Sequence, residues 1–313
     1  MKELRDCRIV FMGTPEFAVA ILDKLVEQGC QVVGVVTAPD KPAGRGMQLT
    51  PSAVKKYALE KGLNILQPPK LKAPEFLEEL AALNADVQVV VAFRMLPESV
   101  WNMPPLGTIN LHASLLPKYR GAAPINWAII NGEKETGITT FKLQHAIDTG
   151  DVLLQQALPI RDDETAGELH DEMKNLGATL VYQTLEQYVS GTLKTKPQAD
   201  LGDPAALPSA PKIHTDTCKI DWNKSLKETY DLVRGLSPYP AAFTFLEGKL
   251  LKIFKSQMKM VEVPEAGKYE SDGKTYLRFS AADGWLYLTE VQLEGKKRMA
   301  IEDFLRGYRL NAS

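Results

Sequence analysis

Asp86-Val-Gln-Val-Val-Val-Ala92 is a short run of apolar and mostly β-branched residues. A run of this kind, without regular polar alternation, is typical of a strand that is buried on both faces of a parallel sheet. Similar runs occur at residues 7–12 and 31–37, and a segment with helical periodicity follows each of them. The sequence around residues 86–92 therefore indicates an α/β domain.

Strands and helices alternate on both sides of this run. The further predicted elements are helices at residues 52–61, 74–83 and 166–189, and strands at residues 64–67, 108–112, 137–143 and 151–158. This βαβ rhythm predicts a doubly wound, mostly parallel Rossmann-like sheet. Ligands of such sheets bind at the carboxyl ends of the strands, so functional residues are expected there.

The pattern changes after residue 190. Residues 191–211 are rich in proline, alanine and turn formers without periodicity, which is typical of a linker. Beyond the linker, one helix at residues 225–236 and a last helix at 301–309 flank several short predicted strands, which lie near 241–246, 250–257, 275–280 and 285–293. We therefore expect a first domain over 1–190, a linker over 191–211, and a small β-barrel domain over 212–313.

Length and composition fit this organisation. A chain of 313 residues exceeds what one hydrophobic core usually serves, so about two domains are expected. The net charge is −2, although residues 209–313 carry 17 Lys and Arg against 14 Asp and Glu. This excess of three positive charges is too small to indicate a nucleic-acid partner by itself.

The sequence favours a cytoplasmic protein. No apolar run reaches the roughly 18 residues that a membrane span needs, and the first residues lack the apolar stretch of a signal peptide. The three cysteines, Cys7, Cys30 and Cys218, have neither metal-ligand nor redox spacing, which fits a reducing compartment. Histidines and carboxylates also lack the spacing of a metal site, so we expect no metal.

The candidate catalytic residues lie at two of the predicted strand ends. Alternation along residues 108–112 would point Ile109 and Leu111 into the core, and Asn110 and His112 together into a pocket. Asp148 follows on a turn next to Gly150. An amide can donate to an oxyanion, an imidazole can move protons, and a carboxylate can orient the imidazole. No strong nucleophile accompanies them, so direct attack by a substrate amine on an acyl group is the expected chemistry.

A chance motif and a nicotinamide site are two alternatives to this assignment. An isolated Asn-x-His is common by chance and can be a pair of buried polar groups that the backbone satisfies. A nicotinamide enzyme is disfavoured, because Gly13-Thr-Pro-Glu-Phe17 lacks the later glycines of the dinucleotide fingerprint.

The loop Asp40-Lys-Pro-Ala-Gly-Arg-Gly46 is a second candidate for function. It is long for a connection inside a compact α/β unit, and such loops are usually functional or disordered. It carries two cations, Lys41 and Arg45, that can reach phosphates. The sequence therefore indicates contact with an anionic substrate here.

Taken in order, the motifs resemble one family over nearly the whole chain. They are Gly13-Thr-Pro-Glu-Phe-Ala18, Lys41-Pro-Ala-Gly-Arg-Gly46, Asn110-Leu-His-Ala-Ser-Leu-Leu-Pro117, Tyr119-Arg-Gly-Ala-Ala-Pro-Ile125 and Ile147-Asp-Thr-Gly-Asp151. This order is similar to that of the methionyl-tRNA formyltransferases, a group of folate-dependent formyltransferases. The Asn-x-His and Asp-Thr-Gly elements are common to the folate-dependent enzymes, and the cationic loop and the C-terminal domain are more specific to those that act on tRNA.

The resemblance implies the substrates and their contacts. The formyl donor would be 10-formyltetrahydrofolate, held in part by Ser114, Leu115, Leu116 and Pro117. The acceptor would be methionyl initiator tRNA, contacted by Lys41 and Arg45 and by a C-terminal domain of the OB-like barrel type. A monomer is the default expectation. One departure from the family stands out: Phe93-Arg94 replaces a Tyr-Gly pair near the pterin, and the added charge must be solvated or paired.

Two alternatives remain open from the sequence. A formyltransferase acting on a sugar nucleotide or a small amine would share Asn110, His112 and Asp148, but it should lack the cationic loop. A module that binds RNA on a catalytically inactive α/β scaffold would have no need for all three catalytic groups.

Overall fold

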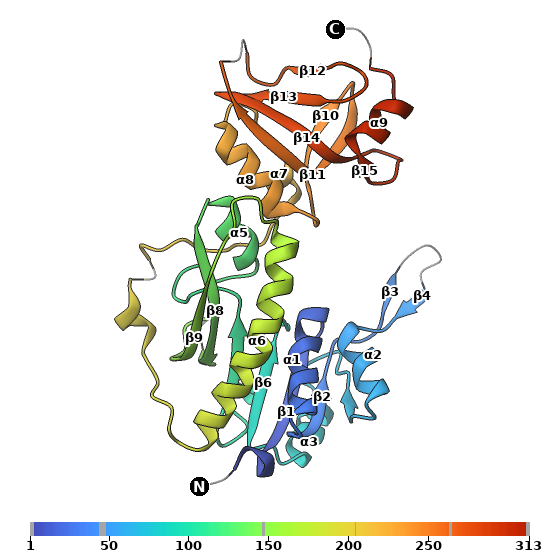
Figure 1. Ribbon diagram of the computed structural model, residues 1–313. Helices are drawn as coiled ribbons and strands as arrows, with labels where there is room; N and C mark the ends of the chain where they lie inside the picture. The colour runs from blue at the N-terminus through green and yellow to red at the C-terminus, as the bar shows by residue number, and fades with distance from the viewer. Residues whose placement is uncertain (1–2, 44–47, 146–147, 204, 263–264, 311–313) are drawn as a thin grey trace. The chain divides into compact units, whose positions relative to one another are not determined.

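The computed structural model describes residues 3–43, 48–145, 148–203, 205–262 and 265–310 (Figure 1). Contacts group the chain into two compact units whose segments interleave along the sequence. The first unit contains Met1–Arg120, Gly137–Leu158 and His170–Pro208. The second unit contains Gly121–Thr136, Pro159–Leu169 and Ser209–Ser313.

A seven-stranded sheet forms the centre of the first unit. Its order is β5-β2-β1-β6-β7-β8-β9, and the first five of these strands are parallel, whereas β8 runs antiparallel to β7. The strands are β1 (Arg8–Gly13), β2 (Gln31–Val36), β5 (Ile65–Leu66), β6 (Val87–Val91), β7 (Thr108–His112), β8 (Glu135–Lys142) and β9 (Val152–Pro159). The chain order reverses between β1 and β6, which is the switch point where such sheets bind ligands.

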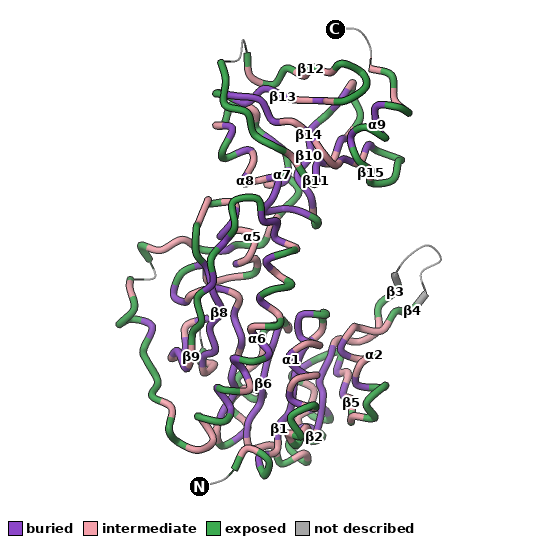
Figure 2. The backbone as a smooth tube through the Cα atoms, viewed as in Figure 1, coloured by how far each residue is buried: buried purple, intermediate pink, exposed green. Residues whose placement is uncertain are grey.

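Helices cover both faces of this sheet, as the buried central strands require; Figure 2 shows those strands in purple. The helices and short helical turns are η1 (Leu4–Asp6), α1 (Glu16–Glu27), α2 (Ala53–Glu60), α3 (Pro74–Ala82), α4 (Glu98–Trp101), α6 (Ala166–Val189) and η2 (Gln198–Leu201). On one face Phe17 of α1 meets His170 of α6. On the other face Phe76 of α3 and Val100 of α4 pack with Val90 of β6.

Two local predictions can be compared directly with these elements. Ser52 caps α2, because its side chain accepts a hydrogen bond from the Lys55 amide at 3.0 Å, as helix N-termini favour. The long loop predicted over residues 40–46 is wrong in part: Lys41–Ala43 forms strand β3, which pairs antiparallel with β4 (Gln48–Thr50), and residues 44–46 lie outside the described residues.

The second unit is built around a curled antiparallel sheet. Its order is β10-β11-β14-β13-β12, with β15 paired to β14. Its elements are α5 (Pro124–Ile130), α7 (Thr215–Cys218), α8 (Leu226–Leu236), β10 (Ala242–Leu246), β11 (Lys249–Met260), β12 (Tyr269–Ser271), β13 (Leu277–Ala281), β14 (Gly284–Leu293), β15 (Met299–Ala300) and α9 (Ile301–Gly307). Leu226 and Leu236 of α8 are buried against Leu251, Phe279 and Leu286 of the sheet. The predicted fold class, a Rossmann-like sheet followed by an OB-like domain, is confirmed.

Two segments that precede residue 170, Gly121–Thr136 and Pro159–Leu169, belong to this second unit. Helix α5 packs against α8, where Asn126 donates to the Gly235 carbonyl at 2.7 Å. A Cβ on Gly235 would lie 2.6 Å from Ile130, so the close approach of the two helices depends on glycine there. The contact grouping thus differs from a simple division at residues 190 and 212, which stays a prediction about the functional domains.

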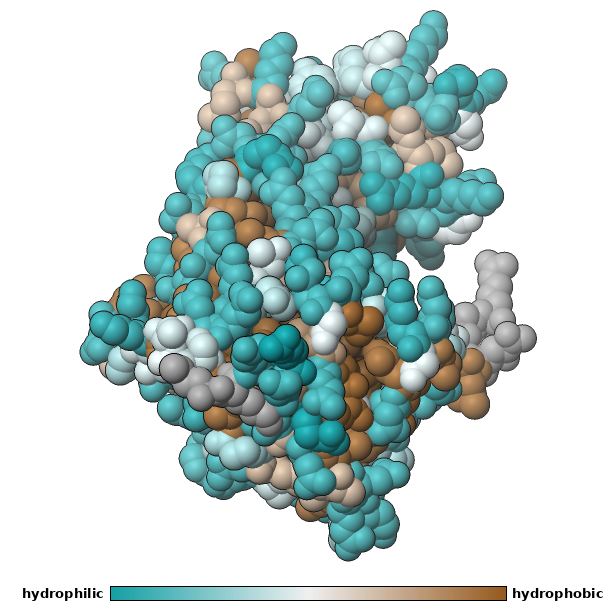
Figure 3. Space-filling view, turned by 60° about the horizontal axis from the view of Figure 1, so that its bottom comes forward, coloured by the Kyte–Doolittle hydropathy of each residue, from teal (hydrophilic) through white to brown (hydrophobic). Residues whose placement is uncertain are grey.

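Polar residues dominate the surface that Figure 3 shows, and hydrophobic residues gather there in smaller patches. The large hydrophobic side chains with the greatest exposure are Tyr239 at 83%, Met95 at 74%, Leu49 at 69% and Met260 at 63%. Within the described ranges, no helix is both long and apolar enough to cross a membrane.

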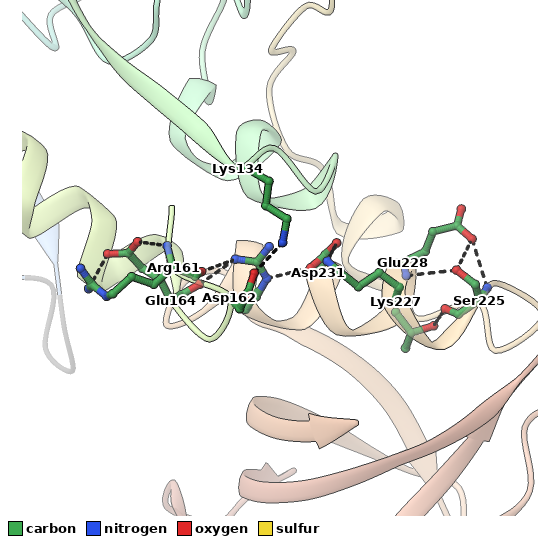
Figure 4. Close-up of polar contacts among 10 residues, drawn as sticks. Lys134, Arg161, Asp162, Glu164, Ser225, Lys227, Glu228 and Asp231 are labelled. Atoms are coloured by element: carbon green, nitrogen blue, oxygen red, sulfur yellow. Dashed lines mark hydrogen bonds and ion pairs between the residues drawn. The ribbon is translucent and has the colours of Figure 1, made fainter. Parts of the chain in front are cut away.

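A buried ion pair anchors α8 within the second unit, and Figure 4 labels its carboxylate, Asp231. Nε of Arg234 donates to Asp231 at 2.7 Å, and both residues are only 3% exposed. Arg234 also donates to the Glu164 carbonyl at 3.2 Å, and Lys227 is a second cationic partner of Asp231. The pair therefore ties α8 to the segment Pro159–Leu169.

We expect Asp231→Ala to destabilise the second unit by about 3 to 5 kcal/mol, because it leaves the buried guanidinium without its carboxylate. Urea unfolding followed by circular dichroism measures the loss. Asp162→Ala is the matched control, since it breaks an exposed pair with Lys134 and should change stability little. Equal losses for both variants would contradict a special role for the buried pair.

Candidate active site

Strand β7 places Asn110 and His112 on the same face of the sheet. A Cβ added to Gly177 of α6 would lie 2.7 Å from Leu111, so Leu111 packs against that helix. Asn110 pairs in register with Val90 and lies on the opposite face, half-buried. His112 ends the strand and is 7% exposed. The predicted alternation along β7 therefore holds, and both polar side chains lie at the carboxyl end of a parallel strand.

Both ring nitrogens of His112 face oxygen atoms. Nε2 lies 2.8 Å from the Tyr119 carbonyl oxygen, which can only accept, so Nε2 carries a proton in this geometry. Nδ1 lies 3.7 Å from Oδ2 of Asp148, which is beyond hydrogen-bond range but within reach of an ion pair when the ring is protonated. The structure thus brings together two of the three predicted catalytic groups at close distance.

The turn that carries Asp148 is tightly constrained. Asp148 is 8% exposed, and its φ of 53° lies in the left-handed region that residues other than glycine seldom adopt. A Cβ at Gly150 would lie 1.5 Å from the Lys142 carbonyl oxygen, so only glycine fits there. Strained backbone of this kind tends to concentrate at functional sites.

Tyr119 and Arg120 follow close to the catalytic groups. Tyr119 also has a left-handed backbone, with φ of 59°, and its amide donates to the Pro208 carbonyl at 2.7 Å. Burial lowers the pKa of Arg120, and the negative charge of Asp148 acts against that shift. Arg120 therefore belongs to the electrostatic surroundings of Asp148.

Side chains of two strands, β8 and β9, hold the predicted folate segment, Ser114–Pro117, by hydrogen bonds to its backbone. Ser114 is fully buried and donates to the Lys118 carbonyl at 2.7 Å. The Thr139 hydroxyl on β8 donates to the Ser114 carbonyl at 2.6 Å and accepts from the Leu116 amide at 3.1 Å. Gln155 on β9 donates to the Leu116 carbonyl at 2.8 Å. These hydrogen bonds hold the backbone of Ser114–Pro117 in one conformation. The contact of this segment with folate stays a prediction.

The unusual Arg94 is paired within the protein. Its guanidinium donates to the carbonyl of Pro69 at 2.9 Å and to that of Pro68, and it lies 5.4 Å from the centre of the Phe93 ring. Burial lowers the pKa of Arg94. The charge that departs from the family pattern therefore connects the segment after β6 to the segment after β5.

The predicted tRNA contacts are only partly described. Lys41 is exposed at the start of β3. Arg45 lies outside the described residues. Of the remaining histidines, His145 and His214 are exposed, and His170 is half-buried against Phe17.

Some residues of this site were missed by the sequence reasoning. Thr139 and Gln155 lie on predicted strands, but polar residues on an edge hairpin give no signal of their role. Gln198 lies in the predicted linker, yet it contacts the Asp148 turn. The role of these side chains becomes visible only in the fold, which brings them close to the carbonyl groups that they bind.

The arrangement suits acyl transfer to an amine without a covalent enzyme intermediate. An amide and an imidazole share one face, and a carboxylate stands beside the imidazole. Among the described residues, no group of three or more His, Cys, Asp and Glu side chains can hold a metal ion.

Comparison with known proteins agrees with this chemistry. Residues 7–185 match the formyl transferase family, and residues 212–309 match the formyl transferase C-terminal domain. A methionyl-tRNA formyltransferase of Parabacteroides distasonis is 56% identical over 312 residues, which cover 97% of this chain and 96% of that protein. One of Bacteroides fragilis is 52% identical over 311 residues, with coverage of 97% and 96%.

Solved structures share the fold at much lower identity. An N-formyltransferase from Helicobacter canadensis, solved with folinic acid and dTDP-3-aminofucose, has a TM-score of 0.68 and 20% identity, covering 93% of this chain and 99% of that one. HypX from Aquifex aeolicus, solved with tetrahydrofolic acid, has a TM-score of 0.67 and 19% identity, covering 97% of this chain and 48% of that one. The family follows from the sequence matches: this chain belongs to the formyl transferases and, among them, to the methionyl-tRNA formyltransferases.

Proposed function

We propose that this enzyme transfers the formyl group of 10-formyltetrahydrofolate to the α-amino group of methionyl initiator tRNA, for translation initiation. The observation that carries the proposal is the pairing of Asn110 and His112 on one strand end with Asp148 3.7 Å from the ring. The high identity to methionyl-tRNA formyltransferases over nearly the whole chain supports this choice of substrates.

The reaction proceeds by direct attack of the neutral amine on the formyl carbon. A new C–N bond forms, and the formyl oxygen takes the displaced electron pair. Asn110 donates a hydrogen bond to this oxyanion, and such donors act mainly in the transition state. The bond between the formyl carbon and the folate nitrogen then breaks, the folate nitrogen gains one proton, and the amine loses one.

His112 supplies the charge or the proton in this sequence of steps, and Asp148 orients it. As an imidazolium the ring stabilises the oxyanion; as a base and acid it carries the proton from the amine to the folate nitrogen. The two roles predict opposite pH dependences of kcat, because they require opposite protonation states of the ring. Ser114, Leu115, Leu116 and Pro117 form a wall of the folate site in this proposal.

The tRNA is held by two parts of the chain. Lys41 and Arg45 contact the acceptor end, and the C-terminal domain over residues 212–313 contacts the phosphate backbone, with residues 191–211 joining it to the catalytic domain over 1–190. We also propose that the enzyme acts as a monomer in the cytoplasm, where thiols outside disulfides, such as those of Cys30 and Cys218, persist.

We expect Lys41→Ala to raise the KM for methionyl tRNA and leave the KM for the folate donor unchanged. Each phosphate contact contributes about one unit to the slope of log KM against log salt, so this slope should fall by about one. Lys194→Ala, which removes an exposed lysine of the predicted linker, is the control. The KM for methionyl tRNA of both variants, measured at several KCl concentrations, gives the slope. An unchanged slope for Lys41→Ala would remove Lys41 from the tRNA contact.

Transfer of labelled formyl groups tests the function as a whole. Methionyl initiator tRNA and methionyl elongator tRNA are offered separately, each with 10-formyltetrahydrofolate. Rapid formylation of the initiator alone supports the proposal. Formylation of a sugar nucleotide or a small amine, with neither tRNA formylated, would replace the acceptor and keep the chemistry.

A further inference from the structure

Gln198 occupies a position that its sequence context does not suggest. It lies in the stretch 191–211, whose composition is that of an exposed linker, and it begins the short turn η2. Its side chain is nevertheless only 3% exposed. Glutamine is seldom buried this deeply without a full set of hydrogen bonds.

Every polar atom of the Gln198 side chain has two partners. Nε2 donates to the carbonyl oxygens of Asp148 and Gly150, each at 2.8 Å. Oε1 accepts from Nε of Arg120 at 3.1 Å and from Nη2 of Arg120 at 2.6 Å. Both protons and both lone pairs of the amide are thereby used.

These bonds act on the turn that carries Asp148. The turn has little intrinsic preference for its conformation, since Asp148 is left-handed with φ of 53°. A backbone pair between Lys196 and Val152, at 2.8 and 2.9 Å, holds the chain just before Gln198 against β9. The backbone next to Gln198 is therefore held in place by β9, so the Gln198 side chain can determine the position of the turn.

We propose that Gln198 is a positioning residue for formyl transfer: its amide holds the Asp148–Gly150 turn so that the Asp148 carboxylate stands opposite His112. The inference rests on the proposed function, because the position of Asp148 affects the rate only if Asp148 and His112 take part in formyl transfer. It gives Gln198 no contact with either substrate. Arg120, bound to the other end of the same amide, connects the segment after β7 to this turn.

Two substitutions separate positioning from mere packing. Gln198→Met keeps the side chain's length and removes all four hydrogen bonds. Gln198→Glu keeps acceptors for Arg120 but cannot donate to the two carbonyl groups. A displacement of a catalytic group by about 1 Å can cost about 100-fold in rate, so we expect both variants to lose about 10- to 100-fold in kcat, with the KM of each substrate little changed. Wild-type kcat in either variant would overturn the proposal.

A double-mutant cycle tests whether Gln198 works through Asp148. In an Asp148→Ala background the carboxylate is already gone, so adding Gln198→Met should lower kcat by less than about threefold more. Multiplication of the two separate losses would show independent action and would also overturn the proposal.

Gln88→Met is the matched control for burial. Gln88 is 1% exposed and accepts from the Thr108 hydroxyl at 3.0 Å, at the beginning of β7, away from its catalytic end. The Gln88→Met substitution should lower the melting temperature as much as Gln198→Met does, yet leave kcat unchanged. If the Gln88→Met control and the two Gln198 variants all lose kcat in proportion to the decrease in their melting temperatures, Gln198 is structural only. If the unmodified chain fails to formylate methionyl tRNA, the proposed function fails first, and the two failures are distinguished.

Discussion

An Asn110→Ala variant is expected to turn over about 100 to 1,000 times more slowly than the unmodified enzyme, which is the usual cost of losing one oxyanion donor. The KM for 10-formyltetrahydrofolate should change little, because the amide interacts with charge that develops only after attack. Asn110 lies at the carboxyl end of β7 between β6 and β8, where its backbone is fixed on both sides by the sheet. The fold should therefore tolerate the change.

Steady-state kinetics with saturating methionyl initiator tRNA measures this loss. Asn64→Ala serves as the control, since Asn64 is exposed and bonds only weakly to the Val33 carbonyl, at 3.4 Å. A rise in the folate KM with an unchanged kcat would mean that Asn110 binds the ground state, and the oxyanion assignment would be wrong.

The second large effect is expected at His112. Replacing it with alanine should lower kcat by about 100- to 10,000-fold, the range observed for general acid–base groups. Asp148→Asn should act in the same direction, because it keeps the shape of the turn but removes the charge opposite the ring. The melting temperatures of both variants show whether folding contributes.

The pH profile of the unmodified enzyme distinguishes the two roles of His112. Stabilisation of the oxyanion requires a charged ring, so kcat would fall on the alkaline side as the ring loses its proton. Relay of the amine proton requires a neutral ring, so kcat would fall on the acid side instead. The limb that belongs to His112 should be absent from His112→Ala. A profile that the substitution leaves unchanged would exclude both roles.

Local pattern was enough to predict most of the fold. The apolar run at residues 86–92 is strand β6, and the alternation at residues 108–112 is strand β7. The alternation also predicted correctly that Leu111 and Asn110 face opposite sides of the sheet, because side chains of a strand alternate whatever the strand pairs with. These features depend on neighbours in sequence, so the sequence displays them.

The rest of the site depends on contacts between residues far apart in sequence. Gln198 lies 50 residues from Asp148 and donates to its backbone carbonyl group. Every residue has such a carbonyl group, so no sequence pattern marks this one as a partner. The same holds for Gln155 and the carbonyl group of Leu116. The grouping of Pro159–Leu169 with α8 likewise follows from the buried carboxylate of Asp231, whose partner Arg234 donates to that segment. Sequence alone shows polar residues at these positions and gives no direction for their bonds.

The interleaved second unit has a consequence for synthesis on the ribosome. About 100 residues separate α5, which ends at Ile130, from its partner α8, which begins at Leu226. At about 5 to 20 residues per second, α5 waits roughly 5 to 20 seconds for that partner to be made. Throughout this interval the face of α5 that packs against α8, which includes Ile130, lacks its partner. Completion of the unit is thus deferred until nearly the whole chain has left the ribosome, and the nascent enzyme passes through a stage in which a chaperone can engage it.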